Sequence, residues 1–451
     1  MTPRLRSALL IAVLLLVVPV SAHTAGFVES DPAPGATATS DTLRVATAVP
    51  LTDAFLLLEA VGPGGAIVTG PARLDPRDPQ AILAPVRRRV SGGHAVRWRG
   101  LGQDGSVVGG AFTYSVAGAG VPAPPVASPI RGGVAAVAVA RGLALLGPIV
   151  ALGLVLLRWW VVAPVALDGG IRPPRRGDRR DGPGERGLAV PDGAWWAAWW
   201  SALVVGGVGL LASPFALAWR LRSWDVATLL AVRPGAALVV QAAALVLAAL
   251  MAVAVARRPV GRVWALALGL PPAAALAAVS ASGHAWVEPD RTVAVGADLL
   301  LNWAAAAWIG GLVGLLVLVA PWLARLPEPD RVPVAAGVVV RFSTLAIAAV
   351  VMLVATGTYR ALAELGAPAD LLDTGYGVAL SVKLALFAVL LVTGGYNRLV
   401  LHPRLERAAL GLRDGDGGAA TALRTSVAAE LALVGALMVA VAVMVAVLPP
   451  S

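Results

Sequence analysis

The feature that most constrains this chain is a series of long apolar segments that begins at Val134 and recurs to the end of the sequence. They cover approximately residues 134–163, 194–218, 234–256, 261–282, 293–322, 337–361, 376–401 and 423–448. An α-helix needs about 20 apolar residues to cross the hydrocarbon core of a bilayer, and each segment reaches that length. The sequence therefore predicts an all-α polytopic membrane bundle of about eight transmembrane helices within residues 134–449, in contact with the lipid bilayer.

The composition agrees with a membrane protein and excludes several kinds of site. Hydrophobic residues make up 58% of the 451 positions and charged residues 14%, whereas a soluble domain has about 25% charged residues. The chain has no cysteine, which excludes disulfides and thiolate metal sites. The net charge of +10 comes almost wholly from arginine, since Lys383 is the only lysine. Such a surplus is typical of cytoplasmic loops, so we expect no nucleic-acid partner.

Residues 1–22 have the features of a secretory signal peptide. Two arginines precede an apolar stretch that ends at Val20, and small residues up to Ala22 occupy the cleavage positions. Cleavage after Ala22 leaves His23 as the first residue, with a free amine and an imidazole that together chelate copper. The alternative is an uncut signal anchor with His23 as an ordinary surface residue. Cleavage is the better interpretation, because the apolar stretch is shorter than the ~20 residues that span a bilayer.

Residues 23–118 have a different sequence pattern, in which short segments alternate apolar residues with small or polar ones. These segments lie at Leu43 and Val45, Phe55 to Val61, His94 to Trp98, and Phe112 to Val116. Turns rich in glycine at 62–65 and 91–93 separate them. The pattern predicts a small all-β sandwich of immunoglobulin or cupredoxin type. Residues 119–133, rich in Gly, Ala and Pro, are expected to link it to the membrane.

The arginines favour one orientation in the membrane. If a cleaved signal places the sandwich outside, the loops after the first, third, fifth and seventh apolar segments lie in the cytoplasm. Those loops and their edges hold most of the arginines, in agreement with the positive-inside rule. We therefore expect a multi-pass protein of the plasma (inner) membrane, with the sandwich and the C-terminus extracytoplasmic.

Several motifs resemble two families of copper-resistance proteins. The stretch from His23 to Ala36, Val96-Arg97-Trp98, and the stretch from Asp104 to Tyr114 resemble copper-resistance protein C (CopC). The pieces that resemble copper-resistance protein D (CopD) are Asp298 with Trp308-Ile309-Gly310-Gly311-Leu312, Arg341-Phe342-Ser343, Thr356-Gly357-Thr358, and Thr374-Gly375-Tyr376-Gly377 with Lys383. Their order is that of CopC–CopD fusion proteins. The resemblance implies an extracytoplasmic copper-binding sandwich joined to a membrane domain that handles copper.

The resemblance also implies a Cu(II) site in the external domain. In the C-type site the N-terminal histidine binds through its amine and imidazole, and an Asp-Gly-His segment adds a carboxylate and a second imidazole. Here His23 and Asp104 match this pattern, whereas Ser106 replaces the second histidine. Cu(II) favours a tetragonal set of nitrogen and oxygen donors, so three donors predict weaker binding. Asp104 also lies in a Gly-rich turn, where a local hydrogen bond is an equally good interpretation.

Two other histidines are weaker candidates for metal ligands. His94 would replace the lost imidazole, but it shares a strand face with Val96 and Trp98, and a core or boundary histidine is the better interpretation. His284 lies at the outer end of the fourth apolar segment. It either receives copper from the sandwich or is an ordinary solvated histidine.

Polar residues inside the apolar segments form a second candidate site. Arg141, Asp298, Asn302 and Lys383 all lie about two turns below the outer surface, and Asp298 and Asn302 share a helix face at a spacing of four. A charge at the centre of a helix costs about 2.5–3.5 kcal/mol on insertion scales, so these groups should pair or line a wet cavity. Two interpretations are open: an outward-facing polar vestibule and a structural ion pair. In either, we expect Lys383 to lie within reach of Asp298.

Two further features concern packing. Glu430 lies nearer the inner side, where its side chain is expected to snorkel to the interface. Gly310 and Gly314, at a spacing of four, predict a close-packing face on the fifth segment.

Together these observations predict a copper-homeostasis protein without enzymatic activity. It would bind Cu(II) outside the membrane, alone or from an external copper chaperone, and pass copper through the membrane domain in uptake or resistance. One alternative is a membrane-anchored sensor or assembly partner with a degenerate metal site. A copper oxidative enzyme is less favoured, because that chemistry needs a second ring ligand and a flat substrate face, neither of which the sequence shows.

The first prediction concerns the start of the mature chain. N-terminal sequencing of the protein purified from membranes should begin at His23, because small residues frame the cleavage point. A sequence that begins at Met1 or after His23 would remove the proposed amine ligand.

Overall fold

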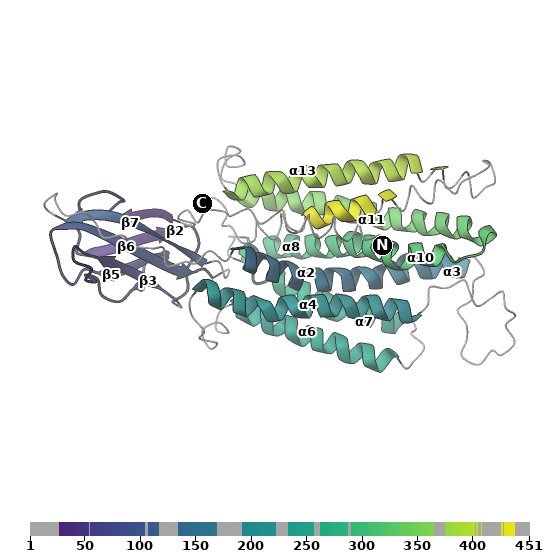
Figure 1. Cartoon of the computed structure of the whole chain (residues 1–451), viewed down its shortest axis with the longest axis horizontal. Coiled ribbons are helices and arrows are strands. Elements are labelled where there is room, and N and C mark those ends of the chain that lie inside the picture. Colours follow the sequence, from purple (N-terminus) through teal and green to yellow (C-terminus); the bar gives the residue numbers. More distant parts are fainter. Residues whose placement is uncertain are drawn as a thin grey trace.

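The fold is a β-sandwich followed by a bundle of helices, as the sequence predicts. The structure is a computed structural model that describes residues 27–53, 55–103, 107–116, 134–168, 192–221, 233–256, 262–286, 290–364, 375–401, 403–404, 407, 425–426 and 428–437. The predicted signal peptide, the linker, His23, Asp104 and Ser106 lie outside these residues. Figure 1 shows the sandwich at one end of the helical bundle.

Seven strands build the sandwich from two antiparallel sheets. They are β1 (Phe27–Asp31), β2 (Thr42–Thr47), β3 (Leu57–Val61), β4 (Arg73–Asp75), β5 (Asp78–Pro85), β6 (Gly92–Leu101) and β7 (Val107–Val116). One sheet has the order β1-β2-β5-β4 and the other β3-β6-β7. The predicted strand from Phe55 begins two residues later, at Leu57, and Phe55 itself has a φ of 61°. That left-handed conformation ends the preceding loop and is incompatible with a strand.

The inward faces of both sheets form one hydrophobic core. Leu43 and Val45 of β2 and Val96 and Trp98 of β6 are fully buried, as their alternation predicts. Trp98 contributes the largest side chain of this core. The sandwich therefore has a core of its own, separate from that of the helices.

The helices follow the predicted apolar segments closely. They are α2 (Val134–Leu156) with η1 (Leu157–Val162) and α3 (Ala163–Asp168), α4 (Asp192–Leu221), α6 (Arg233–Ala256), α7 (Arg262–Ser280), η2 (His284–Trp286), α8 (Arg291–Ala305) with η3 (Ala306–Gly310), α9 (Gly311–Gly314), η4 (Leu315–Val319) and α10 (Ala320–Leu323), α11 (Glu328–Glu364), and α13 (Gly375–Tyr396) with η5 (Asn397–Leu401). A last helix covers Ala428–Leu437. Helix α11 starts nine residues before the predicted segment.

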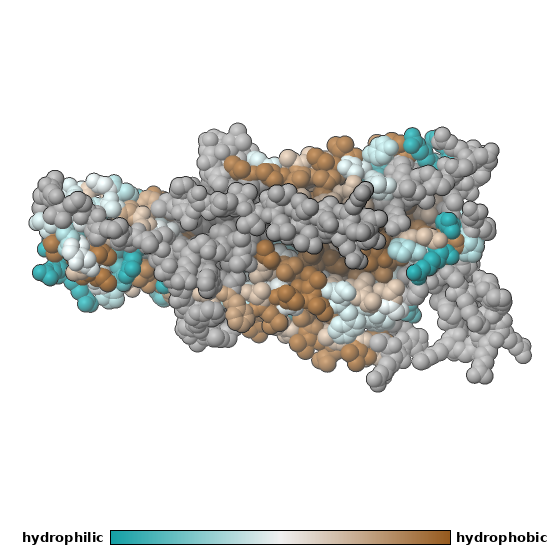
Figure 2. Space-filling view, viewed as in Figure 1, coloured by the Kyte–Doolittle hydropathy of each residue, from teal (hydrophilic) through white to brown (hydrophobic). Residues whose placement is uncertain are grey.

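Six of these helices are long and apolar enough to cross a membrane. Two shorter apolar helices, Ala267–Ser280 and Ala428–Leu437, occupy the fourth and eighth predicted segments within the described residues. The total of eight spans therefore stays a prediction. Figure 2 shows apolar side chains along the flank of the bundle and more polar ones towards its far end and on the sandwich. Outward-facing Leu211, Leu270 and Val392 are examples of this apolar flank, which suits contact with lipid.

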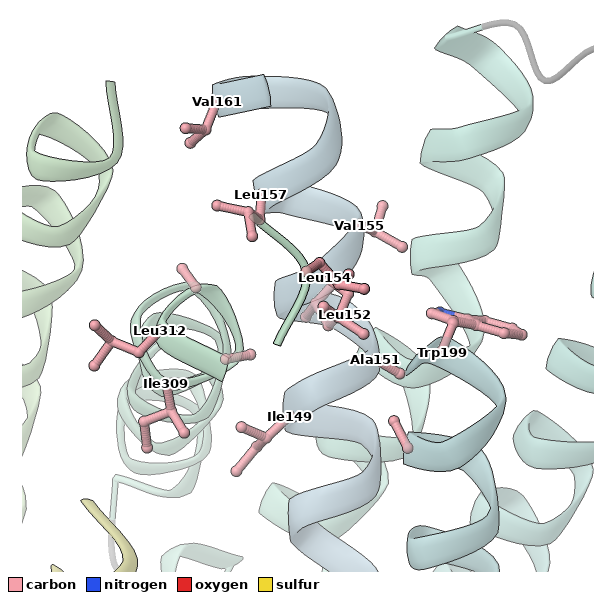
Figure 3. Packing of buried hydrophobic residues seen from close by; sticks show 14 of the residues in the cluster. Ile149, Ala151, Leu152, Leu154, Val155, Leu157, Val161, Trp199, Ile309 and Leu312 are labelled. Atoms are coloured by element: carbon pink, nitrogen blue, oxygen red, sulfur yellow. The ribbon is translucent and has the colours of Figure 1, made fainter. Parts of the chain in front are cut away.

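Helix α2 lies at the centre of the bundle and is packed through glycines. A methyl group added at Gly310 of η3 would lie 2.7 Å from the Cα atom of Gly153 in α2. On the other side, a methyl group at Gly206 of α4 would lie 3.2 Å from the Cα atom of Gly147. Backbones can approach this closely only where side chains are absent. The predicted close-packing role of Gly310 is confirmed, and Figure 3 shows the apolar residues of α2 that surround these contacts.

The second prediction tests this packing. Gly153→Ala should destabilise the bundle by about 1–3 kcal/mol, because the new methyl group would overlap the backbone of η3. Thermal unfolding in detergent measures the effect. Gly296→Ala in α8 is the matched control, since no atom of the described residues lies within 4 Å of the added methyl group. Equal stability of the two variants would contradict the packing described here.

Candidate functional site

The start of β1 and the connection between β6 and β7 lie at the same end of the sandwich. The ring of Phe27 packs against Trp98 and Phe112, with centroids 6.1 and 6.0 Å apart. Phe27 also pairs with Thr47, the last residue of β2. The segment that follows β2 holds the β6–β7 connection, because the amide of Gln103 donates to the carbonyl of Pro50 at 2.8 Å.

Strand direction sets where each end of the sandwich points. After β1 the chain runs beside β7, where the amide of Gly35 donates to the carbonyl of Thr113 at 2.7 Å and Thr37 bridges Ser115 in parallel. The N-terminal end of β1 therefore points towards the start of β7, next to the β6–β7 connection. Among the described residues, no three His, Asp or Glu side chains converge to hold a metal ion. The predicted ligands His23 and Asp104 lie outside that part of the chain.

His94 lies in the core of the sandwich. Its side chain is 1% exposed, and its ring stacks on Tyr114 with centroids 5.0 Å apart and an angle of 16°. Nδ1 lies 3.1 Å from the carbonyl oxygen of Gly92, which can only accept, so Nδ1 carries the proton. Nε2 abuts Gly62, where an added methyl group would lie 3.2 Å away. Burial lowers the pKa of His94 below its usual value, although the bond to Gly92 acts in the opposite direction.

The position of His94 along its strand separates it from the β6–β7 connection. Leu101 lies seven positions after His94 in β6, which corresponds to about 23 Å of extended strand. We therefore interpret His94 as a core residue and do not assign it to the proposed copper site. The backbone of His284 lies in η2, the short turn between α7 and α8, and its side chain is outside the described part.

Asp298 and Asn302 form a polar cluster with a residue that the sequence analysis missed. The Nδ2 atom of Asn302 donates to Asp298 Oδ2 at 3.2 Å and to Ser280 Oγ at 3.0 Å. Asp298 and Asn302 therefore share a face of α8, as their spacing predicts. Ser280 is the last residue of α7 and is buried. The only sequence signal for its role is its place at the end of an apolar segment that turns back into α8.

A buried arginine lies at the same depth on a neighbouring helix. Helix α11 packs against α8, and an added methyl group on Gly357 would lie 4.0 Å from Leu301. The two helices are antiparallel, so Arg360 and Asp298 each lie three residues, about 4.5 Å, further towards the same end. Arg360 is 7% exposed, although its place at the edge of an outer loop predicts solvent contact. Its guanidinium adds positive charge to this level of the bundle.

The other two predicted members of this cluster are partly buried. Arg141 lies in α2 and Lys383 in α13, and both make contacts with other residues. The predicted approach of Lys383 to Asp298 stays a prediction.

Glu430 is buried, so the expectation that it snorkels to the interface is wrong. Its side chain accepts a hydrogen bond from Asn397 Nδ2 on Oε1 at 2.5 Å, and Ser426 Oγ donates to Asn397 Oδ1 at 2.6 Å. Only 4% of Glu430 is exposed. A partner on η5 makes this position tolerable for the carboxyl group, because a buried polar group needs a hydrogen bond.

Two stretches of the chain match models of known families. Residues 27–117 match the CopC domain family, and residues 336–444 match the family of Copper resistance protein D, CopD. The chain therefore carries a region similar to CopC followed by a region similar to CopD. The CopC match covers the sandwich, and the CopD match covers most of α11, all of α13 and the last helix.

Two curated relatives support this assignment. Copper transport protein CutJ of Bacillus subtilis (strain 168) is 33% identical over 125 residues, and Copper resistance protein D of Pseudomonas syringae pv. tomato is 30% identical over 160 residues. These matches cover 28% and 35% of this chain. The chain spans 22% of the first relative's length and 50% of the second's.

Solved structures similar to part of the chain include two copper-resistance proteins. CopC from Methylosinus trichosporium OB3b is 16% identical with a TM-score of 0.20. The match covers 23% of this chain and 99% of the CopC chain. PcoC, a methionine-rich copper resistance protein from Escherichia coli, is 20% identical with a TM-score of 0.19. The match covers 21% of this chain and 99% of the PcoC chain.

The third prediction follows from the burial of His94. Because its pKa is lower in the folded state, the unfolded chain binds the proton first as the pH falls below about 6.5. The stability contributed by neutral His94 is therefore complete above that pH and is lost on acidification. Between pH 7 and pH 5, denaturant unfolding of residues 23–118 should show a loss of stability that His94→Phe lacks. Equal pH dependence of the two proteins would contradict this.

Proposed function

We propose that the chain handles copper at the membrane: the sandwich binds Cu(II) outside, and the helical region passes copper inward. The observation that carries this proposal is the succession of a CopC domain and a CopD region in one chain. The relatives support it, because one is named a copper transport protein and the other a copper resistance protein. The apolar helices support the membrane location.

The proposed copper ligands are the amine and imidazole of His23 and the carboxylate of Asp104. The geometry of the described strands supports this pairing, because the start of β1 points to the end of the sandwich that carries the β6–β7 connection. Four extended residues upstream of Phe27 span about 13 Å, enough to reach that connection. Ser106 supplies no imidazole, so three donors and water complete a tetragonal Cu(II) site of modest affinity.

The proposed route continues through the polar cluster in the outer half of the bundle. Asp298, Asn302 and Ser280 are joined by hydrogen bonds, and Arg360 lies at the same depth. We propose that they line a wet vestibule, since buried charges and amides in a bundle need polar partners or water. In this proposal Lys383 approaches Asp298 and balances its charge, and Arg141 lies at the vestibule's edge.

One observation favours a second candidate function. The replacement of the second family histidine by Ser106 weakens the site, and complete loss of copper binding would leave the sandwich as a sensor or assembly module fixed to the membrane. Metal analysis of purified residues 23–118 separates the two functions. Bound copper supports handling, and a metal-free domain that stays metal-free after copper addition supports the second candidate.

The fourth prediction tests the copper ligands by titration of residues 23–118 with Cu(II). The domain should bind one ion, and His23→Ala should abolish tight binding because it removes the imidazole. Ser106→His should strengthen binding about tenfold or more by restoring a nitrogen donor. Ser91→His is the matched control, because it adds a histidine to an exposed turn at the opposite end of the sandwich. Unchanged affinity in both His23→Ala and Ser106→His would refute this site.

The fifth prediction tests the vestibule through cellular copper content. A strain that lacks the protein should contain less copper than its parent, and neither Asp298→Leu nor Lys383→Met should restore it, because each leaves one buried charge. Thr393→Val at a partly exposed position of α13 should restore it fully. A double mutant that restores copper content would show that the pair is structural. A deletion strain with more copper and greater copper sensitivity would show resistance in place of uptake.

A further inference from the structure

A cluster of tryptophans surrounds Arg158 at the opposite end of the bundle from Asp298. Trp159 follows Arg158 in η1, and Trp195, Trp196 and Trp199 lie in the first turns of α4. These four residues are called the tryptophan cage here. The guanidinium of Arg158 lies 5.5 Å from the ring centroid of Trp159 and 5.6 Å from that of Trp195, within the range of cation–π attraction.

The cage lines a pocket between three helices. Its walls come from Arg158 and the four cage residues, and Leu268 of α7 closes it. The rings of Trp196 and Trp199 meet edge to face, with centroids 6.1 Å apart and an angle of 89°. Figure 3 shows Trp199 across from Val155 of α2, which also lines the pocket. Flat aromatic faces and one cation therefore enclose the same small space.

The pocket carries both signs of charge at its edge. Arg158 forms an ion pair with Asp192, the first residue of α4, where the helix dipole favours a carboxylate. The Asp192 side chain is 73% exposed and that of Arg158 is 22% exposed. The carboxylate is therefore open to a second cation, and the guanidinium has further N–H groups because it carries five donors.

A buried donor in the cage lacks a partner. Trp199 is 4% exposed, and its Nε1 has no hydrogen-bond partner in the part of the chain that the structure describes. A buried N–H without an acceptor is unfavourable, so an acceptor within the cage would stabilise it. Arg158 also lies in a π-helical turn, a distortion that is frequent at functional sites.

The location of the cage indicates which kind of molecule supplies that acceptor. Arg158 lies towards the end of the first candidate span, and Asp192 begins the second, which places the pocket near one membrane–water interface. Tryptophan is enriched at that depth because its ring is apolar and its N–H is polar. A ligand at this depth combines a phosphate with acyl chains that continue along the apolar flank.

We propose that the tryptophan cage binds the headgroup of phosphatidylethanolamine. The phosphate accepts hydrogen bonds from Arg158 and from Nε1 of Trp199. The primary ammonium donates to the carboxylate of Asp192 and packs against the indole faces. An anionic headgroup without an amine leaves Asp192 unmatched and close to a second negative charge. Phosphatidylcholine cannot donate a hydrogen bond to Asp192.

The test compares lipids on the full-length protein in detergent by native mass spectrometry. The probes are phosphatidylethanolamine, phosphatidylcholine and phosphatidylglycerol with identical acyl chains. We expect phosphatidylethanolamine to bind most tightly and to remain bound at the highest energies of collisional activation. Equal binding of the three lipids, or a preference for either of the other two, overturns the proposal.

Single substitutions assign the contacts. Asp192→Asn and Trp199→Phe should each weaken phosphatidylethanolamine binding about tenfold, because the first removes the negative charge that faces the ammonium and the second removes an N–H donor to the phosphate. Asp192→Glu should retain binding, which separates loss of the carboxylate from a folding defect. Trp322→Phe is the matched control, since Trp322 is also buried with an unpartnered N–H in the described part but does not line the pocket. Unchanged binding in Asp192→Asn and Trp199→Phe, or an equal loss in Trp322→Phe, overturns the proposal.

Discussion

The close approach of α2 to its two neighbours is the contact on which the rest of the helical region depends. Lipid tails are as apolar as leucine, so the hydrophobic effect does little to hold helices together in a bilayer, and close van der Waals packing must do so. Gly153 against Gly310 and Gly147 against Gly206 supply that packing on two sides of α2. These contacts fix the rotation of the span that carries Asp298 and of the helix that carries the tryptophan cage.

Polar groups within the bundle are tolerated because neighbouring helices supply their partners. Asn302 links Asp298 to Ser280 across two helices, and Asn397 holds the carboxyl of Glu430. Each arrangement satisfies hydrogen-bonding groups that would otherwise be unpaired in an apolar surrounding. The polar cluster and the tryptophan cage lie towards opposite ends of the bundle. The proposed handling of copper and the proposed binding of lipid therefore use separate surfaces.

The sandwich depends on a different force from the bundle. Its core around Trp98 is closed by the hydrophobic effect in water and shares no residue with the core of the helices. The packing of Phe27 on Trp98 fixes the start of β1 at the end that carries the β6–β7 connection. The copper ligands are therefore proposed on a rigid frame, although Ser106 leaves the ligand set incomplete.

The sequence alone determined the two-part fold, because alternation in strands and the length of apolar helices are local properties that a single segment reveals. It also indicated the shared face of Asp298 and Asn302, since a spacing of four is fixed by helix geometry. Only the tertiary structure decided that Ser280 completes this cluster, that Glu430 is buried, and that tryptophans from two helices enclose Arg158. The physical reason is that hydropathy sets where a helix lies in depth, whereas its rotation and its neighbours are set by packing between distant segments.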